Sequence, residues 1–358
     1  MNTLRGWFVR NFSDPQVVVL AVLLASGVAV VVFLGDLLAP VLAGLVIAYL
    51  LDGPTEALKR RGLPHLAAVC TVFLGFLAAS AFALLAVVPL LSEQVAQLAY
   101  ALPSMVTHLQ GLLLALPERF PQFVDADQIT EMVTALRTEV LQSGQQLVAF
   151  SWERLGNVVS LLVYAFLVPL TIFFFLKDKQ AIFEWFGSYL PADRGLAREV
   201  SREMNRRSGD YVRGKAYEIG LVTVVSLVTF WALGLRFSML LALLTGLSVL
   251  VPYIGVAVVT VPVALVALFQ FGVTGSFFVA LGAYVVIQIL DGNILAPLLL
   301  SEVVSLHPIA VVVAILIFGG IWGFWGLFFA IPLATLADCV LRAWPSTSTP
   351  EAEQTEPA

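Results

Sequence analysis

Long apolar runs separated by short polar joints fill most of this chain, and they set its fold class. We expect spanning helices at about 17–34, 37–51, 67–90, 158–176, 216–234, 238–270, 274–290 and 307–337. A helix needs roughly 20 apolar residues to cross a bilayer, whereas a barrel strand would show alternation over about 10. The pattern therefore predicts an all-α fold, a polytopic helical membrane protein with about eight transmembrane helices.

Three polar joints interrupt the apolar sequence between residues 238 and 308. They are Pro252-Tyr253-Ile254-Gly255, Asp291-Gly292-Asn293 and His307-Pro308. An unsatisfied backbone group in hydrocarbon costs several kcal/mol, so a broken helix persists at membrane depth only where protein or trapped water satisfies the freed groups. We therefore expect broken helices in this region, with the joints lining a route across the membrane.

Basic residues gather in two of the connecting segments. The first is Lys59-Arg60-Arg61, and the second is the stretch 177–215. By the positive-inside rule both segments are cytoplasmic, and an even number of spans then places both termini there. Within the second stretch, residues 193–215 are expected to form an amphipathic helix along the inner surface. The first span is followed by Gly35-Asp36, which we expect to form a tight hairpin and not a signal-peptide cleavage site.

The segment 91–153 is polar and mixed in charge, with apolar residues at helical spacing. We expect a periplasmic helical subdomain, broken at Pro103, Pro117 and Pro121. The predicted organisation is three spans in 1–90, this subdomain in 91–153, a fourth span and basic segment in 154–215, a transmembrane core with broken helices in 216–340, and a disordered tail in 341–358.

Composition agrees with a membrane protein. Of 358 residues, 60% are hydrophobic and 12% are charged, and the mean hydropathy is +0.95. A soluble domain has about 25% charged residues. The formal net charge is −5 and the basic residues lie in loops, so nothing favours nucleic-acid binding. Cys70 and Cys339 lie inside apolar segments and indicate no metal site or disulfide framework.

Asp291 is the leading candidate for a functional group. An ionisable residue within spanning segments usually faces a bundle interior or a pathway. Asp291 could bind an ion or a proton, with Asn293 and free carbonyl groups as neutral ligands at a helix break. The alternative is an ordinary helix cap at the membrane interface, with Asp291 in water. The sequence leaves both open.

Each remaining candidate also has a functional and a purely structural interpretation. The other predicted pathway residues are Pro252, Tyr253, Gly255, Pro297, Glu302, His307 and Pro308. His307 is either a proton relay or, as we favour, part of a helix start at Pro308. Asp178, Arg213, Lys215 and Glu218 form a cytoplasmic gate or, more simply, anchor helices at the interface. Gly319, Gly320, Gly323 and Gly326 would make a helix-packing face, because small residues let helices approach closely in lipid.

Several motifs resemble those of a known family. They are Tyr211–Lys215, Val251–Gly255, Asp291–Pro297, Leu306–Pro308, Gly319–Gly326 and Ala330–Leu333. These segments resemble the autoinducer-2 exporter (AI-2E) family of permeases, and the match is closest to its PerM subgroup. The resemblance covers nearly the whole chain. One departure is Ser301-Glu302, where many members have glycine followed by a basic residue.

The resemblance implies an inner-membrane transporter that works without ATP, has a large periplasmic loop and forms a homo-oligomer, with a pentamer among the expected forms. Relatives export the autoinducer-2 signal, and others exchange sodium or lithium for protons. We therefore expect a bacterial secondary transporter that moves a small solute by efflux, with the lipid bilayer and a small-molecule or cation substrate as partners, and no cofactor.

Other function classes remain as alternatives. A Na⁺(Li⁺)/H⁺ antiporter and a non-transporting scaffold both fit the pattern of spans. An intramembrane protease would need a serine or paired aspartates at facing positions, or a His-Glu-x-x-His helix, and no such arrangement is legible in the sequence. We therefore expect a protein that is not an enzyme.

Overall fold

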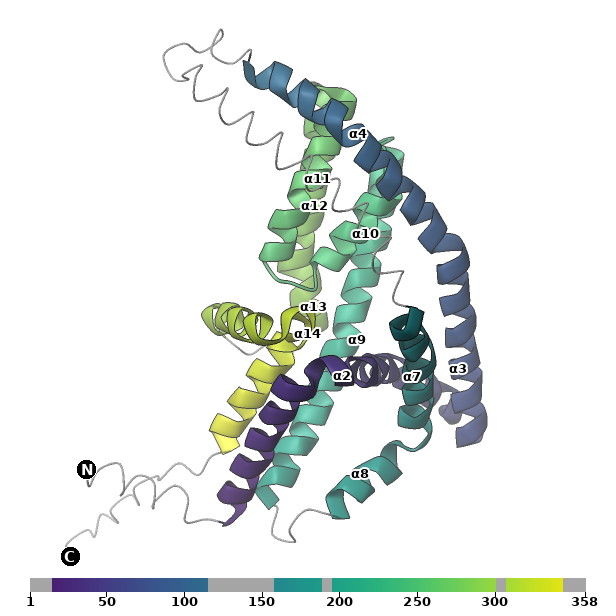
Figure 1. Ribbon diagram of the computed structural model, residues 1–358, viewed down its shortest axis with the longest axis vertical. Helices are drawn as coiled ribbons and strands as arrows, with labels where there is room; N and C mark the ends of the chain where they lie inside the picture. Colours follow the sequence, from purple (N-terminus) through teal and green to yellow (C-terminus); the bar gives the residue numbers. More distant parts are fainter. Residues whose placement is uncertain (1–14, 115–157, 189–194, 301–306, 344–358) are drawn as a thin grey trace, which may run out of the picture. The chain divides into compact units, whose positions relative to one another are not determined.

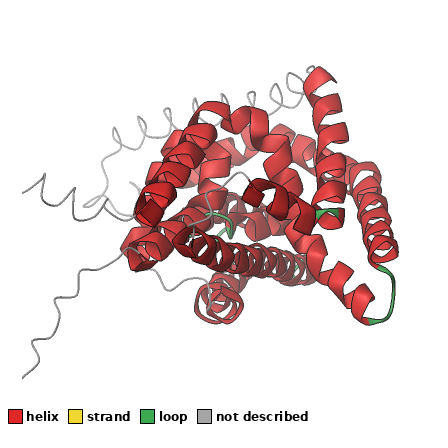
Figure 2. Cartoon of the chain, turned by 90° about the horizontal axis from the view of Figure 1, so that it is seen from below, coloured by secondary structure: helices red, strands yellow, loops and turns green. Residues whose placement is uncertain are grey.

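The computed structural model describes residues 15–114, 158–188, 195–300 and 307–343. Every regular element in these ranges is a helix (Figure 1, Figure 2), which confirms the all-α prediction. Six of the helices are long and apolar enough to cross a membrane, and shorter apolar helices accompany them. The fold is therefore that of a polytopic helical membrane protein.

The helices follow one another with few interruptions. In order they are α2 (Pro15–Arg60), α3 (His65–Phe82), the π-helical turn η1 (Ala83–Val87), α4 (Val88–Leu114), α7 (Val158–Lys177), α8 (Lys179–Ser188), α9 (Gly195–Ala232), α10 (Ser238–Ser248), α11 (Ile254–Phe271), α12 (Gly275–Leu290), the π-helical turn η2 (Asp291–Leu295), α13 (Ala296–Leu300) and α14 (Pro308–Ala343).

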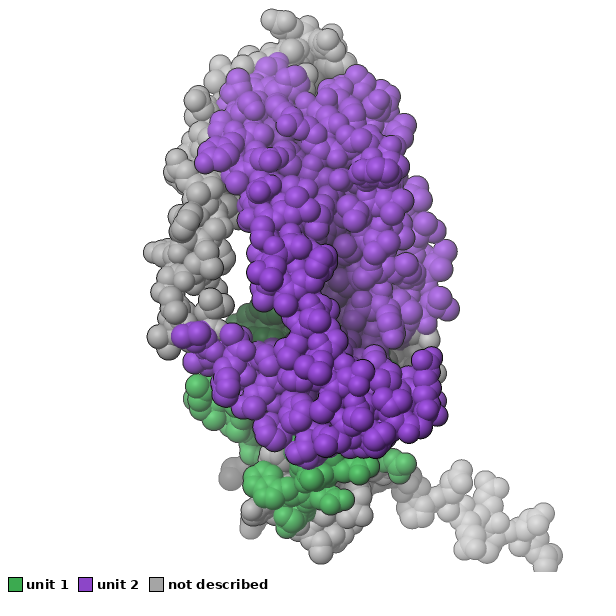
Figure 3. Space-filling view, turned by 90° about the vertical axis from the view of Figure 1, so that its right-hand side faces the viewer, with its two compact units in different colours: residues 1–39, 180–211, 302–358 green, residues 40–179, 212–301 purple. Residues whose placement is uncertain are grey.

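The chain divides into two compact units (Figure 3). We call residues 1–39, 180–211 and 302–358 the first unit, and residues 40–179 and 212–301 the second unit. α14 belongs to the first unit, whereas α10 to α13 belong to the second.

The expected hairpin at Gly35-Asp36 is wrong, because α2 runs through both residues without a turn. A continuous helix satisfies its own backbone groups, which a two-residue turn inside apolar sequence cannot do. Gly35 has a different role in the first unit. A Cβ atom there would collide with the indole ring of Trp322 of α14, so Gly35 permits a close contact between two helices.

The third span is longer than predicted. α3, η1 and α4 form one helix from His65 to Leu114, so Pro103 lies inside α4 and does not break it. Pro117 and Pro121 lie outside the described residues. Pro89 lacks an N–H and would clash with the carbonyl group four residues earlier. The π-helical turn η1 precedes it, and the N–H of Val88 bonds to the carbonyl oxygen of Ala83 across this wider turn.

Two more predicted boundaries differ from the structure. The amphipathic helix 193–215 and the fifth span 216–234 are one helix, α9, because no proline or strained glycine separates them. Its basic half is stabilised by Glu203, which pairs with Arg206 at 2.9 Å and with Arg207 one turn away. At the other end of the chain, α14 extends to Ala343, into the segment expected to be a tail.

The predicted eighth span is broken at Gly323. Its φ of 55° and ψ of −132° are accessible essentially to glycine alone, and α14 is therefore two helices joined at a kink. A Cβ atom at Gly326 would meet the carbonyl oxygen of Phe318, and one at Gly319 would press on Leu327. The glycines thus bring the two halves of α14 together. Packing against a further helix stays a prediction.

The second unit has its largest core where α4, α10, α11 and α12 meet. α10 and α11 both pack on α4, and α11 also packs on α12. Leu241, Val263 and Ala280 are buried in this cluster. The side-chain amide of Gln270 stabilises the turn between α9 and α10. It accepts a hydrogen bond from the backbone N–H of Arg236 and donates one to the carbonyl oxygen of Gly234.

A smaller core joins α2, α3 and α7 in the same unit. Ala48, Val69 and Ile172 are its buried members, one from each helix. Gly44 of α2 faces Thr171 of α7 so closely that a Cβ atom would collide with the threonine side chain. His65 adds a polar contact, because its Nε2 lies 3.1 Å from the carbonyl oxygen of Lys177.

We predict that Gly246→Ala destabilises the protein. A Cβ atom at this position of α10 would collide with the side chain of Thr223 and approach the carbonyl oxygen of Ile219 on α9. Overpacking of this kind costs about 1–3 kcal/mol of the free energy of unfolding. The midpoint of thermal unfolding in detergent should fall by several degrees. Gly282→Ala in α12, where no atom lies within 4 Å of the new methyl group, is the matched control and should not lower it.

Candidate functional site

The joint between α10 and α11 is a strained turn. Tyr253 has φ 65° and ψ −52°, and the N–H of Ile254 donates to the carbonyl oxygen of Pro252 at 2.7 Å. A hydrogen bond across a single residue with positive φ is a rare γ-turn. Gly255 completes the joint, because any Cβ atom there would collide with the carbonyl oxygen of Ser248. The predicted break in the sixth span is therefore present, and its conformation is costly.

The joint at Asp291 is different from the prediction. The helix does not break but widens into the π-helical turn η2 and continues as α13. The residues that were expected to line a pathway at this joint differ in their exposure. Asp291 is 8% exposed, whereas Asn293 and Pro297 are exposed. The side-chain amide of Asn293 donates to the carbonyl oxygen of Ile289 at 2.9 Å, so Asn293 caps its own helix. π-helical turns such as η2 are frequent at functional sites.

Three ionisable side chains meet inside the second unit beside η2. The ammonium group of Lys215 lies 2.9 Å from Oε2 of Glu218, and these two side chains are 5% and 2% exposed. Asp291 lies within electrostatic range of both. In the part of the chain that the structure describes, Oδ1 of Asp291 is buried and has no hydrogen-bond partner. We call Lys215, Glu218 and Asp291 the buried charge cluster.

The local sequence explains how this cluster forms. Lys215 and Glu218 are three residues apart on α9 and therefore share one face of the helix. Gly214 lets that face approach α13 closely, since a Cβ atom at this position would lie 2.7 Å from the carbonyl oxygen of Leu299. The close approach brings this face of α9 against the helix that continues from Asp291 through η2 into α13. With all three groups ionised, the cluster carries one net negative charge.

Further polar residues lie on α12, about one and two helical turns before Asp291. Tyr284 and Gln288 of α12 and Asp291 of η2 recur at helical spacing in a largely apolar stretch. The hydroxyl of Tyr284 lies 3.0 Å from Oγ1 of Thr260 and donates to the carbonyl oxygen of Val256. Among the described residues, neither amide atom of Gln288 has a hydrogen-bond partner of acceptable geometry. Sequence reasoning missed Tyr284 and Gln288, although their spacing from Asp291 was visible.

The other predicted site residues have surroundings of their own or lie outside the described residues. Asp178 lies between α7 and α8 and pairs with Lys177 at 3.5 Å. Arg213 is half-buried near Tyr49. His307 is exposed directly before α14, and its Nδ1 accepts the N–H of Ile309 at 3.3 Å. Pro308 is the first residue of α14, and Glu302 lies outside the described residues.

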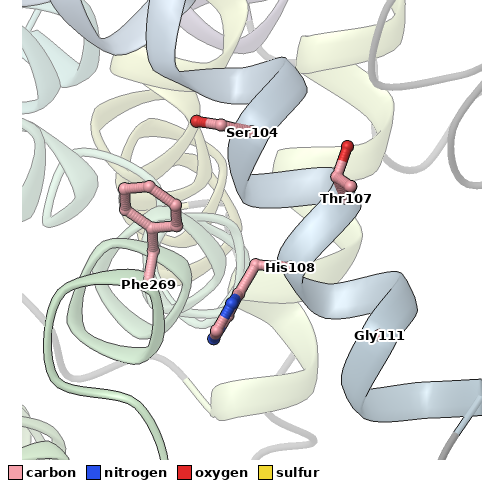
Figure 4. Close-up of a pocket in the computed structure, with 5 residues that line it drawn as sticks. All are labelled: Ser104, Thr107, His108, Gly111 and Phe269. Carbon is pink, nitrogen blue, oxygen red and sulfur yellow. The ribbon is translucent and has the colours of Figure 1, made fainter.

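A separate cavity of about 630 Å³ opens between α4 and α11 of the second unit (Figure 4). Its lining includes Ser104, Thr107, His108, Gly111 and Phe269. The rings of His108 and Phe269 meet edge to face with centroids 6.2 Å apart. The hydroxyls of Ser104 and Thr107 donate to carbonyl groups of their own helix. No sequence motif pointed to this cavity, because it depends on how far α4 extends.

The comparison with known proteins decides the family. The sequence model of the family described as AI-2E family transporter matches residues 20–346 of this chain. The chain belongs to the AI-2E transporter family. This finding confirms the resemblance drawn from the motifs.

Relatives of this AI-2E family chain carry transport names. The protein that bears the name permease PerM in Escherichia coli strain K12 is 43% identical over 96% of this chain and 98% of its own length. The Bacillus subtilis protein named as transport protein YrrI is 27% identical over 84% of this chain and 85% of its own length. A Mycobacterium tuberculosis protein named as transport protein MT0215 is 28% identical over 87% and 84%. Family and helices together establish a multi-pass membrane protein of a transporter family.

We predict that Tyr253→Gly stabilises this AI-2E family chain. A non-glycine residue at a sparsely populated backbone conformation costs about 1–3 kcal/mol, which glycine relieves. Tyr253 is 64% exposed, so its ring adds little packing. The midpoint of thermal unfolding should rise. Tyr253→Ala removes the same ring without relieving the strain, and an equal rise in that variant would contradict the argument.

Proposed function

We propose that this chain is a secondary transporter that moves a small solute out of the cell across the inner membrane, without ATP and coupled to H⁺ or Na⁺. The observation that carries the proposal is the buried charge cluster. Lys215, Glu218 and Asp291 lie inside a bundle of apolar helices, and one carboxylate oxygen of Asp291 is without a partner among the described residues.

The energetics of the cluster favour a cation. Removing an ion from water costs several kcal/mol, which is offset only by a close partner of opposite charge. Lys215 provides that partner for Glu218 at 2.9 Å. Among the described residues Oδ1 of Asp291 has no hydrogen-bond partner, and a proton or a bound cation would supply one. An ionisable residue inside a membrane helix is by default a functional candidate, and the burial of Asp291 supports this interpretation over a cap exposed to water.

Two irregular joints support a solute route through the second unit. The turn at Tyr253 interrupts a helix, and η2 widens another, so both release backbone groups from regular helical bonding. Transporters often bind substrates and ions at such discontinuities. The strain stored at Tyr253 fits a site that changes conformation during transport.

Cation exchange without a separate solute is the second candidate. The net negative charge of the cluster favours it, because a Na⁺(Li⁺)/H⁺ antiporter needs only a carboxylate that alternately takes each ion. The scaffold alternative leaves the unpaired Asp291 without a purpose. Measuring solute export beside cation flux separates the three.

We also propose that both termini face the cytoplasm and that the protein is a homo-oligomer. The basic residues of Lys59-Arg60-Arg61 support the orientation. The most apolar 18-residue stretch of the helix between His65 and His108 contains no residue that is buried inside the protein. Lipid or another copy of the chain must therefore cover it.

Asp291→Asn tests the proposal. We expect it to reduce coupled flux at least tenfold, because the neutral amide cannot exchange a proton or balance a cation. The assays are export profiling of a strain carrying the variant, and H⁺ and ²²Na⁺ flux in proteoliposomes. Glu56→Gln is the control, since Glu56 is half-exposed and paired with Lys59 at 2.9 Å; its flux should match the parent. Parent-like export and ion flux in Asp291→Asn would refute the proposal.

A further inference from the structure

The buried charge cluster contains two carboxylates but only one ammonium group. As whole residues, Lys215 is 4% exposed, Glu218 is 1% exposed and Asp291 is 8% exposed. In the structure the ammonium group pairs with Glu218, and Oδ1 of Asp291 has no partner among the described residues. Two buried anions thus depend on one internal cation.

Lys215 is suited to serve both carboxylates. Its ammonium group has three hydrogens that can donate, on a flexible stem of four carbons. The structure shows one hydrogen bond from it to a side chain in the described residues, the bond to Glu218 at 2.9 Å. Lys215 also lies within electrostatic range of Asp291. Gly214 holds this part of α9 close to α13, which follows η2 directly.

We propose that Lys215 is an internal cation that competes with a transported monovalent cation for Asp291. This inference rests on the proposed coupling at Asp291. When the transported cation occupies Asp291, Lys215 pairs with Glu218. When that cation leaves, Lys215 moves to Asp291, and Glu218 shares it or takes up a proton.

This exchange would couple binding to movement. The cluster holds one net negative charge with all groups ionised, so a single monovalent cation neutralises it and a divalent cation would overcharge it. The departure of the cation pulls Lys215 and its helix toward η2, and its return releases them. Lys215 therefore determines how readily Asp291 gives up its ion, while Asp291 makes the contact.

Binding of ²²Na⁺ to the purified full-length protein tests the competition. Lys215→Met removes the internal competitor and keeps a side chain of similar length. We expect it to bind Na⁺ at least tenfold more tightly and to release it more slowly. Lys179→Met is the matched control, because Lys179 pairs with Asp52 at 3.0 Å in a half-exposed ion pair elsewhere in the unit. Its Na⁺ affinity should equal that of the parent.

Glu218→Gln provides the second arm. Without the carboxylate of Glu218, Lys215 has Asp291 as its one remaining anionic partner in the cluster, so Na⁺ binding should weaken at least tenfold. The two variants therefore shift affinity in opposite directions. A merely structural ion pair would instead weaken binding in both, because each variant leaves a buried charge without its partner.

Asp291→Asn separates this inference from the proposed function. If that variant loses coupled flux while Lys215→Met binds Na⁺ no more tightly than the parent, the competition is wrong and the proposed coupling stands. If Asp291→Asn transports normally, the coupling itself fails and the inference fails with it. A parent protein that binds no Na⁺ also overturns the competition.

Discussion

The constraint on which this structure depends is the absence of water in the hydrocarbon region. Each backbone N–H and carbonyl group must find a partner inside the protein, and each charge must be paired or neutralised. Continuous helices are the simplest solution, and they account for the unbroken course of α2 and α9. Irregular backbone and buried charge are then exceptions. Gly323 is one irregular position in the first unit, and the described part of the second unit combines both exceptions, at Tyr253 and beside η2.

The sequence predicts the helices better than their ends. Apolar run length alone identified α7 and α12, because a run of that length in lipid has few alternatives. It failed at Gly35-Asp36 and at Pro103, where a glycine or a proline suggested a break that the helix absorbs. Whether such a residue breaks a helix depends on its neighbours in space, such as Trp322 against Gly35, and sequence spacing does not contain that information.

The candidate site was predictable only in part, because sequence spacing does not show which residues are neighbours in space. An aspartate inside an apolar run is visible in the sequence, and Asp291 was singled out on that ground. Its grouping with Lys215 and Glu218 was not, because they are about 75 positions away and were interpreted as an interfacial gate or anchor. The close approach at Gly214 joins the two sets. Asn293 and Pro297 show the reverse case, since they lie near Asp291 in sequence but point away from the buried interior.

The uninterrupted helix from His65 to Leu114 has a mechanical consequence. At a rise of 1.5 Å per residue it is roughly 75 Å long, more than twice the roughly 30 Å of the hydrocarbon core. Even when tilted, such a rod must project far from the bilayer, and π-helical η1 lets it pass Pro89 without a hinge. Its far end is not free, because α4 packs on α10 and α11 and the ring of His108 meets that of Phe269 beside the cavity. A tilt of the membrane-embedded part would therefore be passed on to α10 and α11.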